Sequence, residues 1–181
     1  LFTIPISIFG QAEIVGGEDA NIEDYPYQVA LGSSSGGSFF WAYCGASIIN
    51  EYWILTAAHC VAGEMASNTA VRVGSDNDYA QGGTIYDAEQ IISHPNYSNN
   101  GNNWDIALIK LEDPINFNEN TQPVLLACEQ QVDLGVEDPG QMAWVTGWGN
   151  TEGTTSSSQL QVVGVPITTE SNYWGGVNDD E

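Results

Sequence analysis

The feature that most restricts the fold is the alternation of short β-branched and aromatic runs with clusters of Gly, Ser, Asn and Pro. Short strands separated by turn residues are typical of an antiparallel sandwich or barrel. Apolar residues at helical spacing are rare in this chain. We therefore expect an all-β protein with strands at Gln28–Leu31, Ala46–Ile49, Trp53–Thr56, Ala70–Val73, Tyr86–Ile92, Ala107–Leu111, Ala143–Gly147 and Leu160–Val165.

Polar segments between these runs suggest how the chain is divided. Ser33–Ser38 and Thr151–Ser158 are interpreted as flexible loops, and Ser98–Asn103 as a polar loop that contains an Asn-Gly turn. Pro114 and Pro123 flank a stretch of low periodicity that could link two halves. The length of 181 residues allows one large domain or two small ones.

The charge balance excludes some classes of partner. Two Lys and Arg residues stand against 24 Asp and Glu residues, for a formal net charge of -22. Such a field repels nucleic acid and anionic membrane surfaces, and it can attract cationic substrates or partners. The simpler interpretation, that an acidic surface only keeps a protein dissolved, is preferred here. No stretch is apolar over the roughly 20 residues that a membrane span needs.

The strongest local motif is an apolar strand that runs into a histidine and a cysteine, Trp53-Ile54-Leu55-Thr56-Ala57-Ala58-His59-Cys60. An isolated His is most simply a hydrogen-bonded core residue. Here, however, Cys44 lies sixteen positions before Cys60, so that a bridge between them would close a short hairpin and fix the turn that carries His59. A general base needs such fixation, because proton transfer depends on geometry before pKa.

A second candidate is Asp105, which stands at the mouth of the apolar run Ile106-Ala107-Leu108-Ile109. If exposed, Asp105 would cap a loop, as such residues usually do. If buried, its carboxylate could orient a histidine tautomer and stabilise an imidazolium.

Several motifs together identify a family by their order and spacing. They are Ile14-Val15-Gly16-Gly17, Cys44, Thr56-Ala57-Ala58-His59-Cys60, Asp105-Ile106-Ala107-Leu108 and Gly147-Trp148-Gly149. In this order they resemble the chymotrypsin-like (trypsin-fold) serine proteases, over nearly the whole chain from Ile14 onward.

The resemblance implies an all-β fold of two six-stranded antiparallel Greek-key barrels. The protease domain is expected to cover residues 14–181, with the first barrel at about 27–120 and a truncated second barrel from about 135. Residues 1–12 are apolar and end in small residues, so we interpret residues 1–13 as the remnant of a signal peptide, a pro-segment, or both.

The resemblance also assigns roles residue by residue. His59 matches the general base, and Asp105 matches the buried carboxylate that orients it. Cys44 and Cys60 match the disulfide beside that histidine. Ile14 matches the new N-terminus that zymogen cleavage after Glu13 would create.

Some residues depart from the family pattern. The Gly-Asp-Ser-Gly-Gly-Pro segment of the nucleophile does not occur in the sequence, and Ser35-Gly36-Gly37 precedes the histidine. We therefore expect an inactive fragment without its serine. Glu13 stands where relatives carry Arg or Lys, so activation by trypsin itself is not expected. Cys128 resembles a cysteine that bonds to a pro-segment or to the C-terminal part.

Two functions follow from the resemblance. The first is a secreted, extracellular serine endopeptidase, made as a zymogen and acting through an acyl-enzyme. The alternative is a non-catalytic homologue that binds a partner through the same fold. Protein or peptide substrates are the expected partners, with protein protease inhibitors as further candidates, no nucleic acid, no membrane, and a monomer when complete.

No cofactor or metal is expected. Asp76-Asn77-Asp78 begins an acidic turn, but the EF-hand template fails because its sixth position is Gln81. His94 is expected to be structural or surface-facing. Asn96-Tyr97-Ser98 is an N-glycosylation sequon, which makes Asn96 a candidate modification site.

Overall fold

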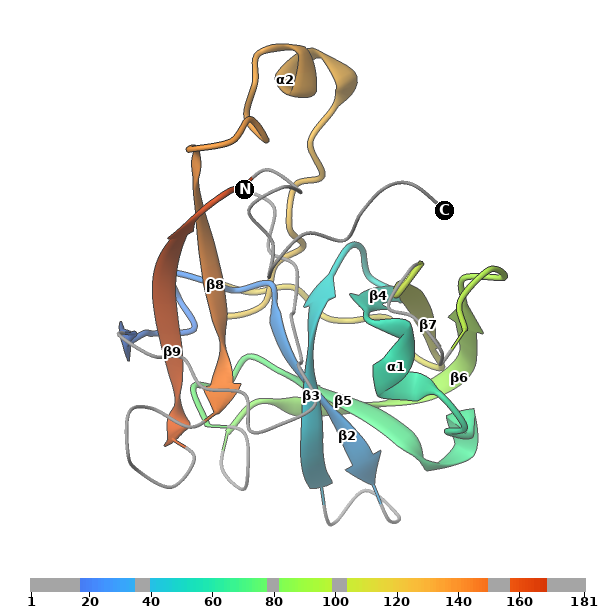
Figure 1. Cartoon of the computed structure of the whole chain (residues 1–181). Helices are drawn as coiled ribbons and strands as arrows, with labels where there is room; N and C mark the ends of the chain where they lie inside the picture. Colours follow the sequence, from blue (N-terminus) through green and yellow to red (C-terminus); the bar gives the residue numbers. More distant parts are fainter. Residues whose placement is uncertain (1–16, 35–39, 78–81, 99–103, 150–156, 169–181) are drawn as a thin grey trace.

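The computed structural model describes residues 17–34, 40–77, 82–98, 104–149 and 157–168. In these ranges the chain consists mainly of strands, with two short helices and one 3-10 turn (Figure 1). In chain order the elements are β1 (Glu18–Asp19), β2 (Gln28–Ser34), β3 (Phe40–Ile48), β4 (Trp53–Thr56), α1 (Ala58–Val61), η1 (Ala66–Asn68), β5 (Thr69–Val73), β6 (Thr84–Ser93), β7 (Ala107–Leu111), α2 (Glu129–Asp133), β8 (Met142–Gly149) and β9 (Ser157–Pro166).

Every strand expected from the sequence overlaps an observed strand. The bounds of β4 and β7 agree to the residue, whereas β3 begins earlier than expected and ends at Ile48, and β6 is longer at both ends. The sequence did not predict β1, because a two-residue strand of exposed acidic side chains has no apolar alternation. The expected all-β class is therefore confirmed.

Six strands form a closed antiparallel barrel in the order β2-β3-β4-β7-β6-β5. They run from Gln28 to Leu111, so the closed first barrel that the resemblance implied is present. Closure leaves no open edge among these strands.

Side chains alternate between the barrel interior and its surface. In β7, for example, Ala107, Ile109 and Leu111 are buried while Leu108 and Lys110 are partly exposed. The same period of two fills the barrel core, which contains Val29, Leu31, Ala46, Ile48, Ile54, Val71, Val73, Ala88, Ile109 and Leu111.

The remaining strands form a separate three-stranded sheet in the order β1-β9-β8. In the described residues this sheet does not close, so the expected second barrel stays a prediction. The three-stranded sheet contacts the first barrel through polar as well as apolar side chains. The Thr146 hydroxyl donates to Gln28 Oε1 at 2.6 Å, and both side chains are buried. The Asp76 carbonyl accepts from Trp148 Nε1 and from the Leu160 amide, each at 2.8 Å.

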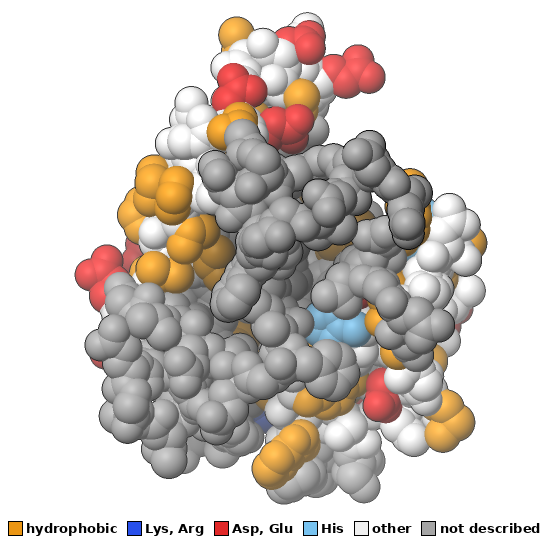
Figure 2. Space-filling model, viewed as in Figure 1, with side chains coloured by type: hydrophobic (Ala, Val, Ile, Leu, Met, Phe, Trp, Pro, Cys, Tyr) orange, Lys and Arg blue, Asp and Glu red, His pale blue; other side chains and the backbone are white. Residues whose placement is uncertain are grey.

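The segment that carries α2 projects from the rest of the chain (Figure 1). Figure 2 shows acidic side chains gathered at its tip, and exposed acids here are Glu129, Asp133, Glu137 and Asp138. The sequence did not predict α2, since its five residues carry no helical apolar pattern. No helix in the described ranges is both long and apolar enough to cross a bilayer.

Both basic residues of the chain lie in barrel strands. Arg72 in β5 is only 7% exposed, and its guanidinium lies 4.8 Å from the centre of the Phe40 ring. Lys110 in β7 forms a 2.7 Å ion pair with Glu89. The loops and the α2 segment therefore carry acidic charge without basic partners of their own.

The barrel core provides a test of the fold. Ile109→Ala removes a side chain that is 0% exposed at the centre of β7. We expect a loss of about 2–5 kcal/mol in the free energy of unfolding, because a cavity replaces packed atoms. The measurement is urea denaturation followed by tryptophan fluorescence.

The matched control is Ile92→Ala on the neighbouring strand β6, where the side chain is 40% exposed. This change is expected to cost at most about 1 kcal/mol. Equal losses for the two variants would contradict the assignment of Ile109 to the core.

Candidate active site

Strand pairing brings His59 and Asp105 to the same end of the barrel. β4 and β7 are antiparallel neighbours, with Thr56 opposite Ala107. His59 follows the end of β4 by three residues, and Asp105 precedes the start of β7 by two. Two residues 46 positions apart in sequence are therefore delivered to one place.

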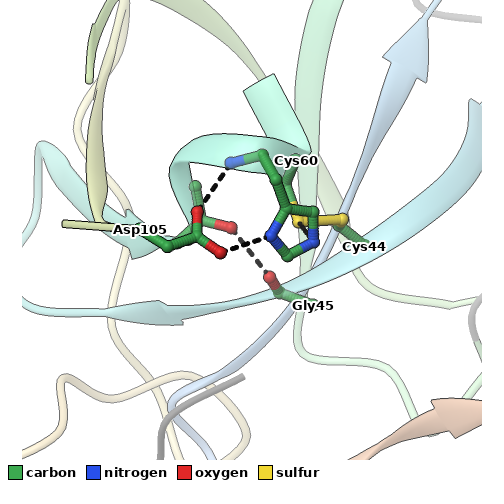
Figure 3. Close-up of polar contacts among 6 residues, drawn as sticks. Cys44, Gly45, Cys60 and Asp105 are labelled. Carbon is green, nitrogen blue, oxygen red and sulfur yellow. Dashed lines mark hydrogen bonds and ion pairs between the residues drawn. A yellow bond between two sulfur atoms is a disulfide. The ribbon is translucent and has the colours of Figure 1, made fainter. Parts of the chain in front are cut away.

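His59 lies on a short helix that follows β4 directly. Ala57 is extended and Ala58 begins α1, and these side chains are 6% and 0% exposed, so only small residues fit at this turn. At the end of β4 the Thr56 hydroxyl donates to the Gly45 carbonyl at 3.0 Å, which ties the turn to β3 (Figure 3).

A disulfide anchors the same turn. Cys44 on β3 is bonded to Cys60 on α1, sixteen residues later (Figure 3). The bond covalently joins the helix that carries His59 to the barrel wall, as the sequence suggested. His59 Nε2 lies 3.4 Å from Cys60 Sγ. These sulfurs and the imidazole are near enough to share a metal ion, but disulfide sulfur is not the thiolate that binds zinc.

Asp105 occupies a tight turn before β7. Trp104 has φ 61, a left-handed conformation that costs a non-glycine residue about 1–3 kcal/mol. The Ile106 amide donates to the Trp104 carbonyl at 2.8 Å, so a three-residue turn is centred on Asp105. The indole of Trp104 is 57% exposed and stacks on His94, with 4.6 Å between ring centroids and 8° between planes.

Both carboxylate oxygens of Asp105 are used by His59. Oδ2 lies 2.6 Å from His59 Nδ1, and Oδ1 accepts the His59 main-chain amide at 2.8 Å (Figure 3). The two side chains are 16% and 21% exposed. Asp105 is thus partly buried and contacts His59, so the structure does not match the exposed loop cap.

This geometry is suited to proton transfer. When the ring proton is on Nδ1 and faces Asp105, Nε2 is the basic nitrogen of the neutral imidazole. The carboxylate also stabilises the imidazolium that forms when Nε2 accepts a proton. Two hydrogen bonds from one residue leave the carboxylate little freedom to rotate, so the tautomer and the ring orientation are both set.

Two tyrosines near the site have altered acidity. Burial raises the pKa of the Tyr97 phenol above its ordinary value of about 10, and the charge of Asp105 raises it further. Burial also raises the pKa of Tyr43, with an additional contribution from Glu64. Both phenols therefore stay neutral at physiological pH.

The other candidates lie elsewhere. Ile14 and Glu13 are outside the described residues, so the activation N-terminus stays a prediction. Asn96 is exposed in the turn after β6, where its amide donates to His94 Nδ1 at 3.2 Å; its glycosylation also stays a prediction. Cys128 is an exposed free cysteine. Asp76 accepts a hydrogen bond from the Ile22 amide.

Sequence reasoning missed the left-handed turn at Trp104 and its stack on His94. An indole side chain has no preference for the left-handed region, so the sequence contained no local signal for this turn. Only the closeness of Trp104 to Asp105 could have drawn attention to it.

Comparison with known proteins identifies the family of the chain. The Trypsin family matches residues 14–180. The chain is 36% identical to Trypsin 5G1 of Aedes aegypti over 92% of its own length and 61% of that protein. It is 35% identical to Trypsin-2 of Salmo salar over 88% of the chain and 64% of the relative. It is also 35% identical to Serine proteinase stubble of Drosophila melanogaster, over 93% of the chain and 22% of that protein.

The chain therefore belongs to the trypsin family of chymotrypsin-like serine proteases. It spans 61% to 64% of the length of the two trypsins that it matches.

The disulfide provides a test of how the site is held. Replacing Cys44 and Cys60 together by Ser is expected to lower the free energy of unfolding by about 2–4 kcal/mol, since the unfolded chain loses a cross-link over a loop of this size. The measurement is guanidinium denaturation of the double variant against the parent.

Cys128→Ser is the control, because this cysteine is free and exposed. It should unfold at the same denaturant concentration as the parent. Equal stability of the double variant and the parent would show that the bridge contributes nothing to the fold.

Proposed function

We propose that this protein is a secreted serine endopeptidase in which His59 acts as the general base and Asp105 orients it. The observation that carries the proposal is the paired contact of Asp105 with the ring and the main-chain amide of His59, at 2.6 and 2.8 Å. Family membership supports the reaction class, since trypsin-family relatives match most of the chain.

In the proposed reaction, Nε2 of His59 takes the proton of a serine hydroxyl as the serine attacks a peptide carbonyl. The same nitrogen then returns the proton to the leaving amine. In the second half of the reaction, Nε2 takes a proton from water as the water attacks the acyl-enzyme, and returns it to the serine oxygen that leaves. Asp105 stays ionised throughout and faces the imidazolium. The motif of the family's nucleophile does not occur in these 181 residues, so we assign the serine to a part of the protein outside them.

Secretion and zymogen activation belong to the same proposal. The Cys44–Cys60 disulfide is of the kind that persists in oxidising compartments. We place the activation cleavage after Glu13, which calls for a protease that accepts an acidic residue. Protein and peptide substrates, and protein inhibitors, are the proposed partners.

The test is Asp105→Asn in the protein that carries this chain, at its natural length and after activation. The variant should lose hydrolysis of peptide amides by about 10⁴ in kcat, an order known for this triad, because the amide no longer holds the reactive tautomer. Initial rates over a series of substrate concentrations separate kcat from KM.

Asp113→Asn is the matched control, since it removes an exposed carboxylate in the loop after β7. It should hydrolyse the substrate as the parent does. Unaltered kcat in Asp105→Asn would refute the assigned role. A parent protein without any hydrolysis would make the non-catalytic, partner-binding homologue the leading function.

A further inference from the structure

We propose that the stacked rings of His94 and Trp104 form a positioning pair that holds Asp105 in the conformation in which it contacts His59. Neither residue touches the imidazole of His59 through a hydrogen bond in the described structure, so the pair acts through Asp105. The catalytic consequence of this proposal rests on the proposed function, whereas its geometrical part does not.

The first observation is the quality of the stack. The rings are separated by 4.6 Å between centroids and are nearly parallel, at 8°. Trp104 is 57% exposed, so burial of the indole in a core does not account for its fixed position. The two residues come from different segments, His94 directly after β6 and Trp104 before β7, and these strands pair up to Ser93 and Ala107.

The second observation is that His94 restrains Asp105 from both sides. The His94 ring stacks on the residue before Asp105, and the His94 amide donates to the Ile106 carbonyl, on the residue after it, at 2.9 Å. Asp105 is therefore the single residue between two contacts with His94. His94 is held in its own turn, where its Nδ1 accepts the Asn96 amide at 3.2 Å.

The third observation is the left-handed backbone of Trp104, with φ 61. A tryptophan does not prefer this region, so something must hold it there. Relaxation to an extended conformation would change the direction in which the chain enters Asp105. The main-chain hydrogen bond from the Ile106 amide to the Trp104 carbonyl opposes this relaxation, so the backbone turn and the ring stack are separate restraints on Asp105.

Two variants of Trp104 separate the backbone from the stack. Asn tolerates the left-handed region but cannot stack as an aromatic ring does. Phe keeps an aromatic face for His94 and is no better suited to the left-handed region than Trp. The proposal predicts that Trp104→Asn weakens the contact of Asp105 with His59 and that Trp104→Phe preserves this contact.

The readout is the proton on His59 Nδ1, observed by nuclear magnetic resonance in nitrogen-15-labelled protein. The chain has two histidines, so His94→Gln assigns the remaining ring signals to His59. In Trp104→Asn and in His94→Gln we expect this proton to exchange with water about tenfold faster or more, because its bond to Asp105 opens more often. Trp104→Phe should restore slow exchange.

Phe117→Asn is the control, since it replaces a 40% exposed aromatic residue in the segment that follows β7. It should leave the exchange rate as in the parent. Unchanged exchange in a folded Trp104→Asn or His94→Gln variant overturns the proposal. Failure of both to fold, while Trp104→Phe folds, would assign the pair to folding and equally overturn it.

In the active protein, Trp104→Asn should lower kcat by up to about 10²-fold with KM little changed, since a displaced carboxylate misorients the base. A parent protein that hydrolyses no peptide would refute the proposed function but leave the exchange measurement valid. A normal exchange rate beside normal catalysis in Trp104→Asn would refute the positioning role alone.

Discussion

The pairing of β4 with β7 is the constraint on which the candidate site depends. These strands are distant in sequence, and their register sets Thr56 opposite Ala107. The chain leaves β4 into α1 and enters β7 from a tight turn at the same end of the barrel. Without this pairing His59 and Asp105 would not lie close together, because they are distant in sequence and no local structure connects them.

The two halves of the site are held by different means. On the histidine side the restraint is covalent, through the disulfide from Cys44 to Cys60. On the aspartate side it is conformational, with Asp105 enclosed in a turn that begins at a left-handed Trp104. The hydrogen bonds between His59 and Asp105 then join two segments that are already placed, so little ordering remains for the pair itself to achieve.

Much of this arrangement could be predicted from the sequence. Period-two patterns such as that of β7 located the strands, and the order of the motifs indicated a closed first barrel with His59 and Asp105 in it. The helix α2 could not be predicted, because Glu129–Asp133 is short and has no buried face. Nor could the backbone of Trp104, since a tryptophan side chain has no preference for its left-handed φ of 61.

The positions of Arg72 and Lys110 affect how readily other proteases can digest this chain. A protease that cuts after Lys or Arg must draw several residues of an exposed, flexible segment into its own cleft. Arg72 is buried in β5 and Lys110 lies within β7, so each is held by ladder hydrogen bonds on both sides. Digestion at these residues requires the barrel itself to open, and the lifetime of the chain among such enzymes then follows the stability of its barrel.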